Sequence, residues 1–522
     1  MLKTINLGMQ FGGRKLYSHV DLTFSKGNCY GIIGANGAGK STFLKILAGD
    51  LESTEGEVYK DPGERMSVLR QDQNAYNDKT VMDTVLLGWP ELIKIRDEKD
   101  ALYQKEDFTD ADGLLAAELE GEFANMGGYE AESDAETLLS GLGVDESYFY
   151  ELMGNIDAKI KIKVLLAQAL FGNPDILLLD EPTNNLDINA TRWLENFLAT
   201  FENTVLIVSH DRHFLNNVCT HICDVDFGKI KLFVGNYEFW YESSQLALRQ
   251  SQDQNKKNEA KIKELKEFIA RFSANKSKSR QATSRKKLLE KIDVSTIEPS
   301  TRRYPYIGFK PEREPGRDIL TVTKLTKPGL FQNLSFTVNK GDKIAFLASN
   351  TKQINALFNI LAGRDEDYEG TYKWGVTMKP GFLFQENDDL FNNDLTLINF
   401  LRQYSPDPNE TVVRGFLGRV LFSGEEASKI CKVMSGGEKI RANLAKLMVE
   451  SPNALVFEDP TNHLDLESIT SLNNGMVQYP SNILFSSHDA ELLSTVANRI
   501  ISFNEDGTFV ERSVGYEEFI GE

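Results

Sequence analysis

The chain of 522 residues has no apolar run of about 18 residues, so it predicts no membrane-spanning helix. It also shows no signal-peptide core, because Met1 to Thr4 lead straight into a strand-like pattern. Positive charge is scarce: 58 Lys and Arg against 77 Asp and Glu give a net charge of −19. This argues against non-specific nucleic-acid binding by the whole surface. The hydrophobic fraction of 41% is ordinary for a globular protein, and we expect a cytoplasmic one.

Cysteine is rare as well, with four residues in the whole chain. Cys219 and Cys223 flank His221 in the sequence CTHIC, which hints at a metal site. A structural zinc site normally has four protein ligands. Buried thiols in a reducing compartment are therefore the better interpretation.

Two parts of the chain carry the same motifs in the same order. The first contains GIIGANGAGKST, LRQDQ, ILLLDEPTNNLD and VLIVSHD, and the second contains AFLASNTKQINA, LFQEN, ALVFEDPTNHLD and ILFSSHD. Lys40 aligns with Ile354 at an offset of 314 positions, and Asp180 with Glu458 at an offset of 278. The first copy therefore carries 36 extra residues, which fall around 86–129 and have a helical composition. We expect two domains, at 1–240 and 317–522.

Residues 241–301 separate the two copies and predict a helical hairpin with a basic tip. Leu and Ile recur at helical spacing on either side of the small and basic loop SANKSKSRQATS. Between Arg249 and Lys291, 14 Lys and Arg stand against 5 Asp and Glu, a net charge of +9. A basic segment on an acidic protein is a candidate contact for a polyanion, and a solvated helical face is the alternative.

The first copy contains a complete P-loop, GANGAGKS, between an apolar strand-like run and a helical stretch. Its glycines let backbone N–H groups curl around phosphates, and the N-terminus of the helix adds a positive dipole. Lys40 is expected to reach the β- and γ-phosphates of ATP, and Ser41 to bind Mg²⁺. The expected nucleotide contacts in this loop are Gly34, Asn36, Gly37, Gly39, Lys40, Ser41 and Thr42.

Two further strands deliver chemically useful side chains to the carboxyl edge of the same predicted sheet. Asp180 ends one strand and is suited to bind Mg²⁺, partly through water. Glu181 follows it and is suited to polarise the attacking water. His210 ends the other strand, and we expect it near the γ-phosphate. Gln71 is expected to couple Mg²⁺ and the attacking water to the inserted segment.

These motifs resemble the ABC ATPase superfamily and, within it, the ABC-F family. LRQDQ, LLAQALF, DEPTNNLD, SHDRHFLN, GNYE and the linker phrase RFSANKSKSRQATSR are most similar to the bacterial YbiT-type subgroup. The resemblance covers nearly the whole chain. It implies an α/β fold with two P-loop ABC-type nucleotide-binding domains, joined by a helical-hairpin linker and without a transmembrane part. The two domains are expected to pair within one chain, as a monomer, and to sandwich two ATPs.

The family resemblance also implies roles for segments and residues outside the P-loop and the acidic strand ends. The segment at 86–129 corresponds to the arm, and the linker at 241–301 is expected to enter the ribosomal E site towards the peptidyl-transferase centre. Phe11 would be the aromatic residue that stacks on adenine. Leu186 and Asp187 would lie in the D-loop.

Each ATP in such a pair lies between the P-loop of one domain and the LSGGQ-like signature of the other. The first P-loop meets a sound signature in the second copy, where Ser435, Gly436, Gly437 and Glu438 are the expected nucleotide contacts. We call this composite site, built on Lys40, site one.

Site two, the reverse pairing, departs from the family pattern at every element. Its P-loop has no glycine, and Ile354 stands where the phosphate lysine belongs. Asp157 replaces the signature serine, and the acidic pair is inverted as Glu458 and Asp459. The adenine-stacking aromatic residue is also lost. Because each lost hydrogen bond to a charged group costs roughly 1.5–3 kcal/mol, we expect one competent ATP site.

The resulting hypothesis is an ATPase that hydrolyses ATP at site one, binds the ribosome through rRNA or tRNA contacts of residues 241–301, and modulates translation. Two alternatives stay open. An ATPase subunit of a membrane exporter would need a partner with membrane helices. A regulatory protein would hold ATP with little turnover.

Overall fold

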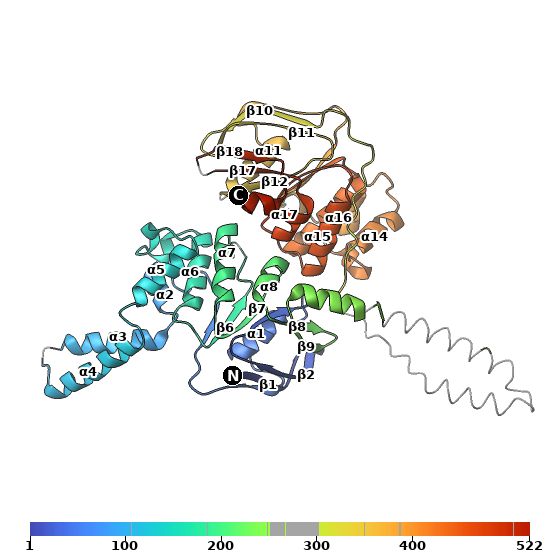
Figure 1. Ribbon diagram of the computed structural model, residues 1–522. Helices are drawn as coiled ribbons and strands as arrows, with labels where there is room; N and C mark the ends of the chain where they lie inside the picture. The colour runs from blue at the N-terminus through green and yellow to red at the C-terminus, as the bar shows by residue number, and fades with distance from the viewer. Residues whose placement is uncertain are drawn as a thin grey trace, which may run out of the picture.

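The computed structural model describes residues 1–522 except 106, 185, 248, 251–266, 268–301, 349, 386–387, 505 and 522. It contains two α/β domains, with domain one below domain two in Figure 1. Most of the expected linker, including its basic tip, lies outside the described residues. Within the described part of the chain, no helix is both long enough and apolar enough to cross a membrane.

Domain one is built on a six-stranded sheet with the order β5-β6-β7-β3-β8-β9. Its neighbouring strands are parallel except for β9, which runs antiparallel to β8. Every residue of β3 and β7 is buried, as the continuous apolar runs predict for strands covered on both faces. The strands are β3 (Cys29–Ile33), β5 (Met66–Val68), β6 (Ile176–Asp180), β7 (Thr204–Val208), β8 (His221–Asp226) and β9 (Lys229–Val234).

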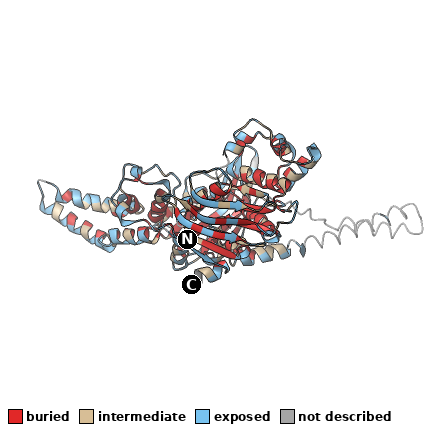
Figure 2. Ribbon diagram, turned by 90° about the horizontal axis from the view of Figure 1, so that it is seen from above, coloured by how far each residue is buried: buried red, intermediate tan, exposed pale blue. Residues whose placement is uncertain are grey.

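A three-stranded antiparallel sheet packs beside it with the order β2-β1-β4, and helices cover the faces of the larger sheet. Figure 2 shows buried residues concentrated in the strands and on the inner sides of the helices. These strands are β1 (Leu2–Phe11), β2 (Arg14–Phe24) and β4 (Glu55–Lys60). The helices are α1 (Lys40–Ala48), α2 (Val81–Leu86), α3 (Pro90–Tyr103), α4 (Asp110–Asn125), α5 (Ala131–Gly141), α6 (Ala158–Leu170), α7 (Ile188–Ala199) and α8 (Arg212–Val218), with 3₁₀ turns η1 (Glu146–Tyr148) and η2 (Met153–Asn155).

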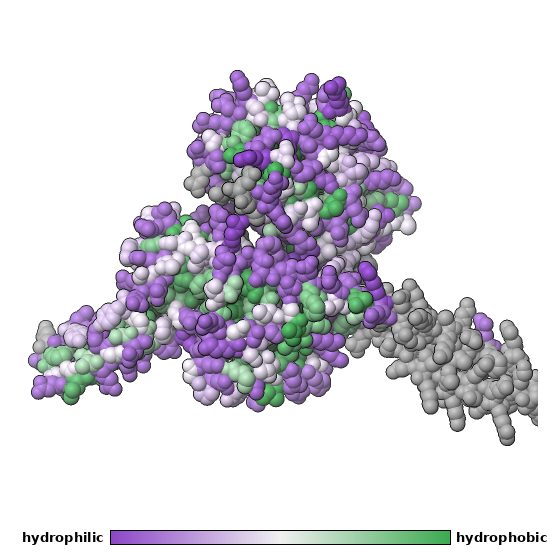
Figure 3. Space-filling view, in the orientation of Figure 1, coloured by the Kyte–Doolittle hydropathy of each residue, from purple (hydrophilic) through white to green (hydrophobic). Residues whose placement is uncertain are grey.

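The inserted segment is helical, as its composition predicts. Helices α3 and α4 pair as a hairpin that projects from domain one between α2 and α5 (Figure 1). Its far half has a small apolar cluster of its own, Leu102, Ala116 and Leu119 with Ile95. Figure 3 shows a mainly hydrophilic face, with apolar side chains at the end of this hairpin, where Leu114 is 77% exposed.

Domain two repeats both sheets, in the orders β14-β15-β16-β12-β17-β18 and β11-β10-β13. Its strands are β10 (Leu320–Lys327), β11 (Phe331–Val338), β12 (Lys343–Ala348), β13 (Glu369–Trp374), β14 (Pro380–Leu383), β15 (Ala454–Phe457), β16 (Asn482–Ser486), β17 (Arg499–Phe503) and β18 (Phe509–Arg512). Its helices are α11 (Thr351–Leu361), α12 (Asp388–Phe391), α13 (Leu397–Arg402), α14 (Glu410–Arg419), α15 (Gly436–Glu450), α16 (Leu466–Gln478), α17 (Ala490–Val496) and α18 (Tyr516–Gly521), with 3₁₀ turns η3 (Gly424–Ser428) and η4 (Cys431–Val433). The repeat predicted from the motif order is confirmed.

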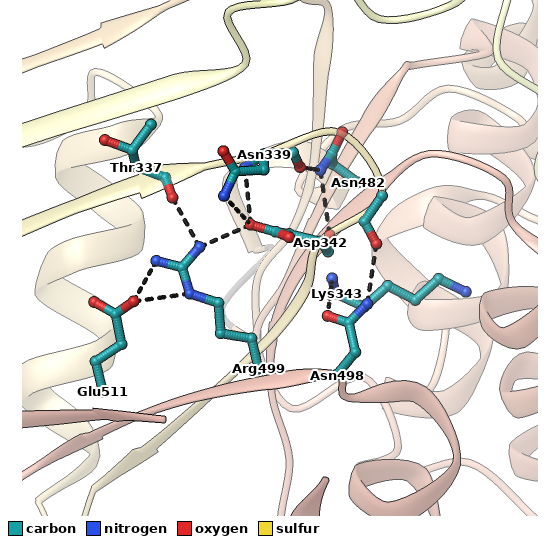
Figure 4. A network of polar contacts seen from close by, with 9 residues as sticks. Thr337, Asn339, Asp342, Lys343, Asn482, Asn498, Arg499 and Glu511 are labelled. Atoms are coloured by element: carbon teal, nitrogen blue, oxygen red, sulfur yellow. Dashed lines mark hydrogen bonds and ion pairs between the residues drawn. The ribbon is translucent and has the colours of Figure 1, made fainter. Parts of the chain in front are cut away.

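A buried arginine joins the two sheets of domain two. Arg499 on β17 donates from Nη1 to the carbonyl of Thr337 at 2.8 Å and lies 2.7 Å from the Asp342 carboxylate. Its Nε also donates to Glu511 on β18 at 3.0 Å. Figure 4 shows this network, with Asn498 bonded to the same β11–β12 turn. The network fixes the start of β12 relative to the smaller sheet.

The domains touch along the start of α16 and between α8 and α17. Leu466, at the start of α16, is buried in the apolar cluster of domain one. Arg212 on α8 forms an ion pair with Glu491 on α17 at 2.9 Å. Domain two is therefore docked on domain one through its own side chains.

The four cysteines are buried and free, as the sequence predicts. Cys29 and Cys219 lie with their Sγ atoms 3.8 Å apart. Of the residues that the structure describes, no three His, Cys, Asp or Glu are grouped as metal ligands.

Candidate ATP site

The P-loop of domain one connects β3 to α1 through a backbone that only glycine can follow at two points. Gly39 has a φ of 102°, and a Cβ there would lie 3.0 Å from Leu16 and 3.1 Å from Tyr17. A Cβ on Gly34 would lie 2.6 Å from the carbonyl oxygen of Val225. The loop therefore packs directly against β2 and β8, with no room for side chains at these positions.

Lys40 lies inside the curve of this loop. Its Nζ donates to the carbonyls of Gly34 at 2.8 Å and Ala35 at 3.4 Å, and the residue is 7% exposed. Gly39, at the N-cap of α1, has no side chain that could occupy the first N–H groups of the helix. An ammonium group and free helix-terminal donors thus face the same concavity, which suits a phosphate group.

Two of the side chains expected to hold Mg²⁺, those of Ser41 and Gln71, converge on the carboxylate of the third, Asp180. Ser41 Oγ donates to Asp180 Oδ1 at 3.2 Å, and Gln71 Nε2 donates to Asp180 Oδ2 at 3.2 Å. Burial raises the pKa of Asp180, while hydrogen bonding from Ser41 and the charge of Lys40 lower it. Hydroxyl, amide and carboxylate oxygens are ligands that Mg²⁺ accepts, so these residues fit the ion.

Glu181 and His210 form a buried pair at the adjoining strand ends. Glu181 Oε1 lies 3.3 Å from His210 Nε2, and the backbone N–H of His210 donates to Glu181 Oε2 at 3.2 Å. Burial raises the pKa of Glu181 to about 8 and lowers that of His210 to about 3. A carboxyl group that titrates near neutrality is suited to accept a proton. His210 Nδ1 is buried and finds no hydrogen-bond partner among the described residues, so it can contact a ligand.

The expected adenine contact is less well defined. Phe11 ends β1 and is 50% exposed. A hollow beside the P-loop is lined by Lys15, Leu16, Gly37, Ala38, Val225, Asp226 and Gly228, and Phe11 is not part of that lining. The structure therefore leaves its stacking role a prediction.

Domain two contributes charge to this site through the start of α16. Burial lowers the pKa of Lys40. Four nearby carboxylates act against this and raise the pKa; in decreasing order of effect they are Glu181, Glu467, Asp465 and Asp180. Two of these carboxylates, Asp465 and Glu467, come from domain two. Asp465 also caps α16, since it accepts from the N–H of Ser468 at 2.9 Å.

The signature of domain two forms the start of α15. Ser435 accepts a hydrogen bond from the N–H of Glu438, and the Glu438 carboxylate accepts one from the N–H of Ser435 at 2.8 Å, which makes a capping box. Lys429 pairs with Glu438 at 2.7 Å. Gly437 lies against the carbonyl of His463, where a Cβ would be 2.6 Å away. These contacts stay within domain two, and the approach of the signature to the P-loop stays a prediction.

The corresponding loop in domain two is not a P-loop in shape. Helix α11 begins at Thr351, which aligns with Gly37, whereas α1 begins at Lys40. One extra helical turn therefore replaces the curve that surrounds Lys40. Asn350 caps this turn, because its side-chain oxygen accepts a hydrogen bond from the N–H of Lys352 at 3.1 Å. This helix-terminal N–H is therefore bonded to a side chain of the protein itself.

Two positions of site two are occupied by buried protein side chains, beside a small pocket lined by Thr351, Ile354, Asp459 and His488. Gln353, which aligns with Gly39, is buried and donates to the carbonyls of Leu330 and Asn504, both at 2.9 Å. Ile354 is buried in the apolar cluster of domain two. Lys352 is exposed, as predicted.

The signature of domain one aligns as the sequence indicated. Asp157 is the N-cap of α6 and Ser435 is the N-cap of α15, at the same offset of 278 positions. Lys159, in the first turn of α6, reaches domain two: its Nζ lies 3.4 Å from Thr351 Oγ1. Burial raises the pKa of Asp459, and the charges of His488 and Lys159 lower it.

Glu467 and Lys159 were not predicted as functional residues. Glu467 aligns with Asn189, which carries no charge, and Lys159 stands in a degenerate signature. No motif marks either residue, because each acts across the contact between the domains.

Comparisons with known proteins agree with this architecture. Two family models, both described as ABC transporter, match residues 17–184 and 223–309. The ABC transporter ATP-binding protein YkpA of Bacillus subtilis (strain 168) is 54% identical over 100% of this chain and 97% of its own length. The probable ATP-binding protein YbiT of Escherichia coli O157:H7 is 43% identical over 100% and 99%.

A further relative and a solved structure extend the comparison. The energy-dependent translational throttle protein EttA of Escherichia coli (strain K12) is 30% identical over 97% of this chain and 93% of its own. The structure of RNase-L Inhibitor matches with a TM-score of 0.62 and 17% identity, over 99% of this chain and 91% of that one, which shows a shared fold. Because these sequence matches run through both α/β domains, the chain belongs to the ABC-F family of ABC ATP-binding proteins.

Proposed function

We propose that this protein hydrolyses ATP at site one alone and uses the reaction to act on the ribosome during translation. The observation that carries the first part is the contrast between the two loops. Lys40 lies in a glycine curve at an uncapped helix end, and Ile354 lies in an apolar core behind an extra, capped turn. A triphosphate needs the positive charge and N–H donors of the first arrangement.

In this proposal Glu181 accepts the proton of the attacking water, and His210 lies beside the terminal phosphate. Mg²⁺, held by Ser41 and Asp180 with Gln71 nearby, would neutralise phosphate charge. Site two serves as a contact between the domains, supported by the approach of Lys159 to Thr351.

Matched substitutions in the two sites test this assignment. Glu181→Gln is expected to lower steady-state phosphate release at least ~100-fold, because the amide cannot accept the proton. Asp459→Asn, at the aligned position of site two, is expected to change it less than twofold. A chain whose turnover depends equally on Asp459 would contradict single-site hydrolysis.

The action on the ribosome draws support from the relative named a translational throttle protein and from the net charge of +9 between Arg249 and Lys291. Such a basic segment favours RNA phosphates. The Glu181→Gln chain with MgATP is expected to cosediment with 70S ribosomes, and Lys40→Ala is expected to prevent this. No cosedimentation at low salt would refute this part while leaving the ATP site intact.

A further inference from the structure

Arg302 lies where both domains and both ends of segment 241–301 meet. Trp240 precedes that segment and Arg302 follows it, and the Arg302 Cζ lies 4.5 Å from the centroid of the Trp240 ring. The Arg302 side chain is 9% exposed. A guanidinium group stacked on an aromatic face at this burial is held in a defined position.

The guanidinium group pairs with one carboxylate from each domain. Nη2 lies 2.6 Å and Nη1 3.3 Å from the carboxylate oxygens of Asp224 on β8. Nε lies 2.9 Å from Oε1 of Glu467, in the first turn of α16. Glu467 is buried, so its charge depends on this ion pair for compensation.

Both carboxylates lie close behind site one. Asp224 pairs with Ile33, the last residue before the P-loop, in the register between β3 and β8. Glu467 follows Leu466, which is buried in domain one, and it acts electrostatically on Lys40. Glu467 is therefore one of the four carboxylates whose charge acts on the phosphate-binding lysine, after Glu181.

We propose that Arg302 is a positioning residue for site one: it holds Glu467 in a buried ion pair and so leaves Lys40 free to bind the triphosphate. Without Arg302, Glu467 would be a buried carboxylate whose available cation across the contact is Lys40. The inference rests on the proposed use of site one.

The test measures MgATP binding by calorimetry in the full chain carrying Glu181→Gln, which slows turnover. Arg302→Met is expected to weaken binding about tenfold, because Glu467 then competes with ATP for Lys40. Adding Glu467→Gln is expected to restore the affinity to within threefold of the parent. Arg303→Met, at the exposed neighbouring arginine, is the matched control and is expected to stay within twofold.

Rescue by Glu467→Gln shows that the loss acts through Glu467, and urea unfolding of both variants is measured to exclude a loss of folded protein as its cause. An unchanged affinity in Arg302→Met, or a double variant as weak as the single one, would overturn the inference while leaving the proposed function intact. If Arg302→Met does not fold by circular dichroism, Arg302→Lys replaces it: a threefold loss recovered by Glu467→Gln supports the inference, and no loss overturns it. A parent chain that binds no MgATP would overturn the proposed function, and this inference with it.

Discussion

Aligned residues of the two copies have different surroundings and different hydrogen bonds at the start of the P-loop helix. Gly39 is the N-cap of α1 and forms no side-chain cap, whereas Gln353 at the equivalent place is buried and donates to two carbonyls. The same holds for Lys40 and Ile354, one facing a polar concavity and the other packed in a core. A single residue exchange therefore cannot convert one site into the other, because the backbone between these positions also differs.

Substitutions at this aligned pair are expected to separate binding from stability. Gly39→Ala should lower MgATP affinity at least tenfold and destabilise domain one by about 1–2 kcal/mol, since a Cβ at φ 102° is strained. Gln353→Ala should leave affinity unchanged but destabilise domain two by about 1–3 kcal/mol, because two carbonyls lose their donor. Calorimetry and urea unfolding measure both effects. Loss of affinity in Gln353→Ala would contradict the assignment.

Helices α8 and α17 meet at their N-termini with like charges at the caps. Asp211 caps α8 by accepting from the N–H of Phe214 at 3.0 Å. Burial raises the pKa of Asp211 to about 7, and the charge of Asp489, the cap of α17, acts in the same direction. His213 lowers this pKa and Glu195 raises it. A carboxyl group with a raised pKa favours the folded state when it is protonated.

The contribution of Asp211 to stability is therefore present near pH 4 and lost as the pH rises through about 7. Asp211→Asn keeps an oxygen for the cap and removes the titration. Its melting temperature should exceed that of the parent at pH 8, with the difference shrinking towards pH 5. Differential scanning calorimetry across this range measures it. An identical pH dependence in both chains would refute titration of Asp211 as the cause, and Asp145→Asn, at an exposed cap, is the control.

Substitution of Arg499 is expected to destabilise domain two. Arg499→Met removes the cation shared by Asp342 and Glu511, which leaves partly buried carboxylates without compensation. The expected loss is about 3–5 kcal/mol of unfolding free energy. Guanidinium unfolding checks this value, with Arg512→Met on the exposed edge strand as comparison. A loss below about 1 kcal/mol would show that the network contributes little.

Local patterns were sufficient to predict the elements that carry site one and the helical insertion. Apolar runs predicted β6 and β7, the glycine loop predicted the turn into α1, and composition predicted the helices of the insertion. The extra turn of α11 was not predicted, since it follows from the absence of glycine together with the cap at Asn350. The contacts of Arg302 and Lys159 depend on which surfaces the two domains bring together, and no pattern within a short window carries that information.

At the scale of the whole molecule, the α3–α4 hairpin inserted in domain one distinguishes it from domain two. Domain two folds without such an insertion, and α13 packs on α14 where α2 packs on α5 in domain one. The far half of the hairpin has its own cluster, around Leu102 and Leu119. Its near end contributes Leu92 and Phe123 to the core of domain one. The far half is thus separable from the ATP site.

Replacement of residues 97–118 by a short glycine turn is expected to leave folding and ATP turnover within twofold of the parent, because Leu92 and Phe123 stay in place. Ribosome cosedimentation should weaken if this hairpin is an arm that contacts the ribosome. Phosphate release and sedimentation are measured on the same preparation. Loss of turnover would contradict the independence of the hairpin from site one.

The most direct test of single-site use is the number of nucleotides bound per chain. Equilibrium dialysis with radiolabelled ATP and Mg²⁺ on the Glu181→Gln chain is predicted to give one ATP per chain, which Lys40→Ala abolishes. Two ATPs per chain, or one that survives Lys40→Ala, would contradict the use of site one alone.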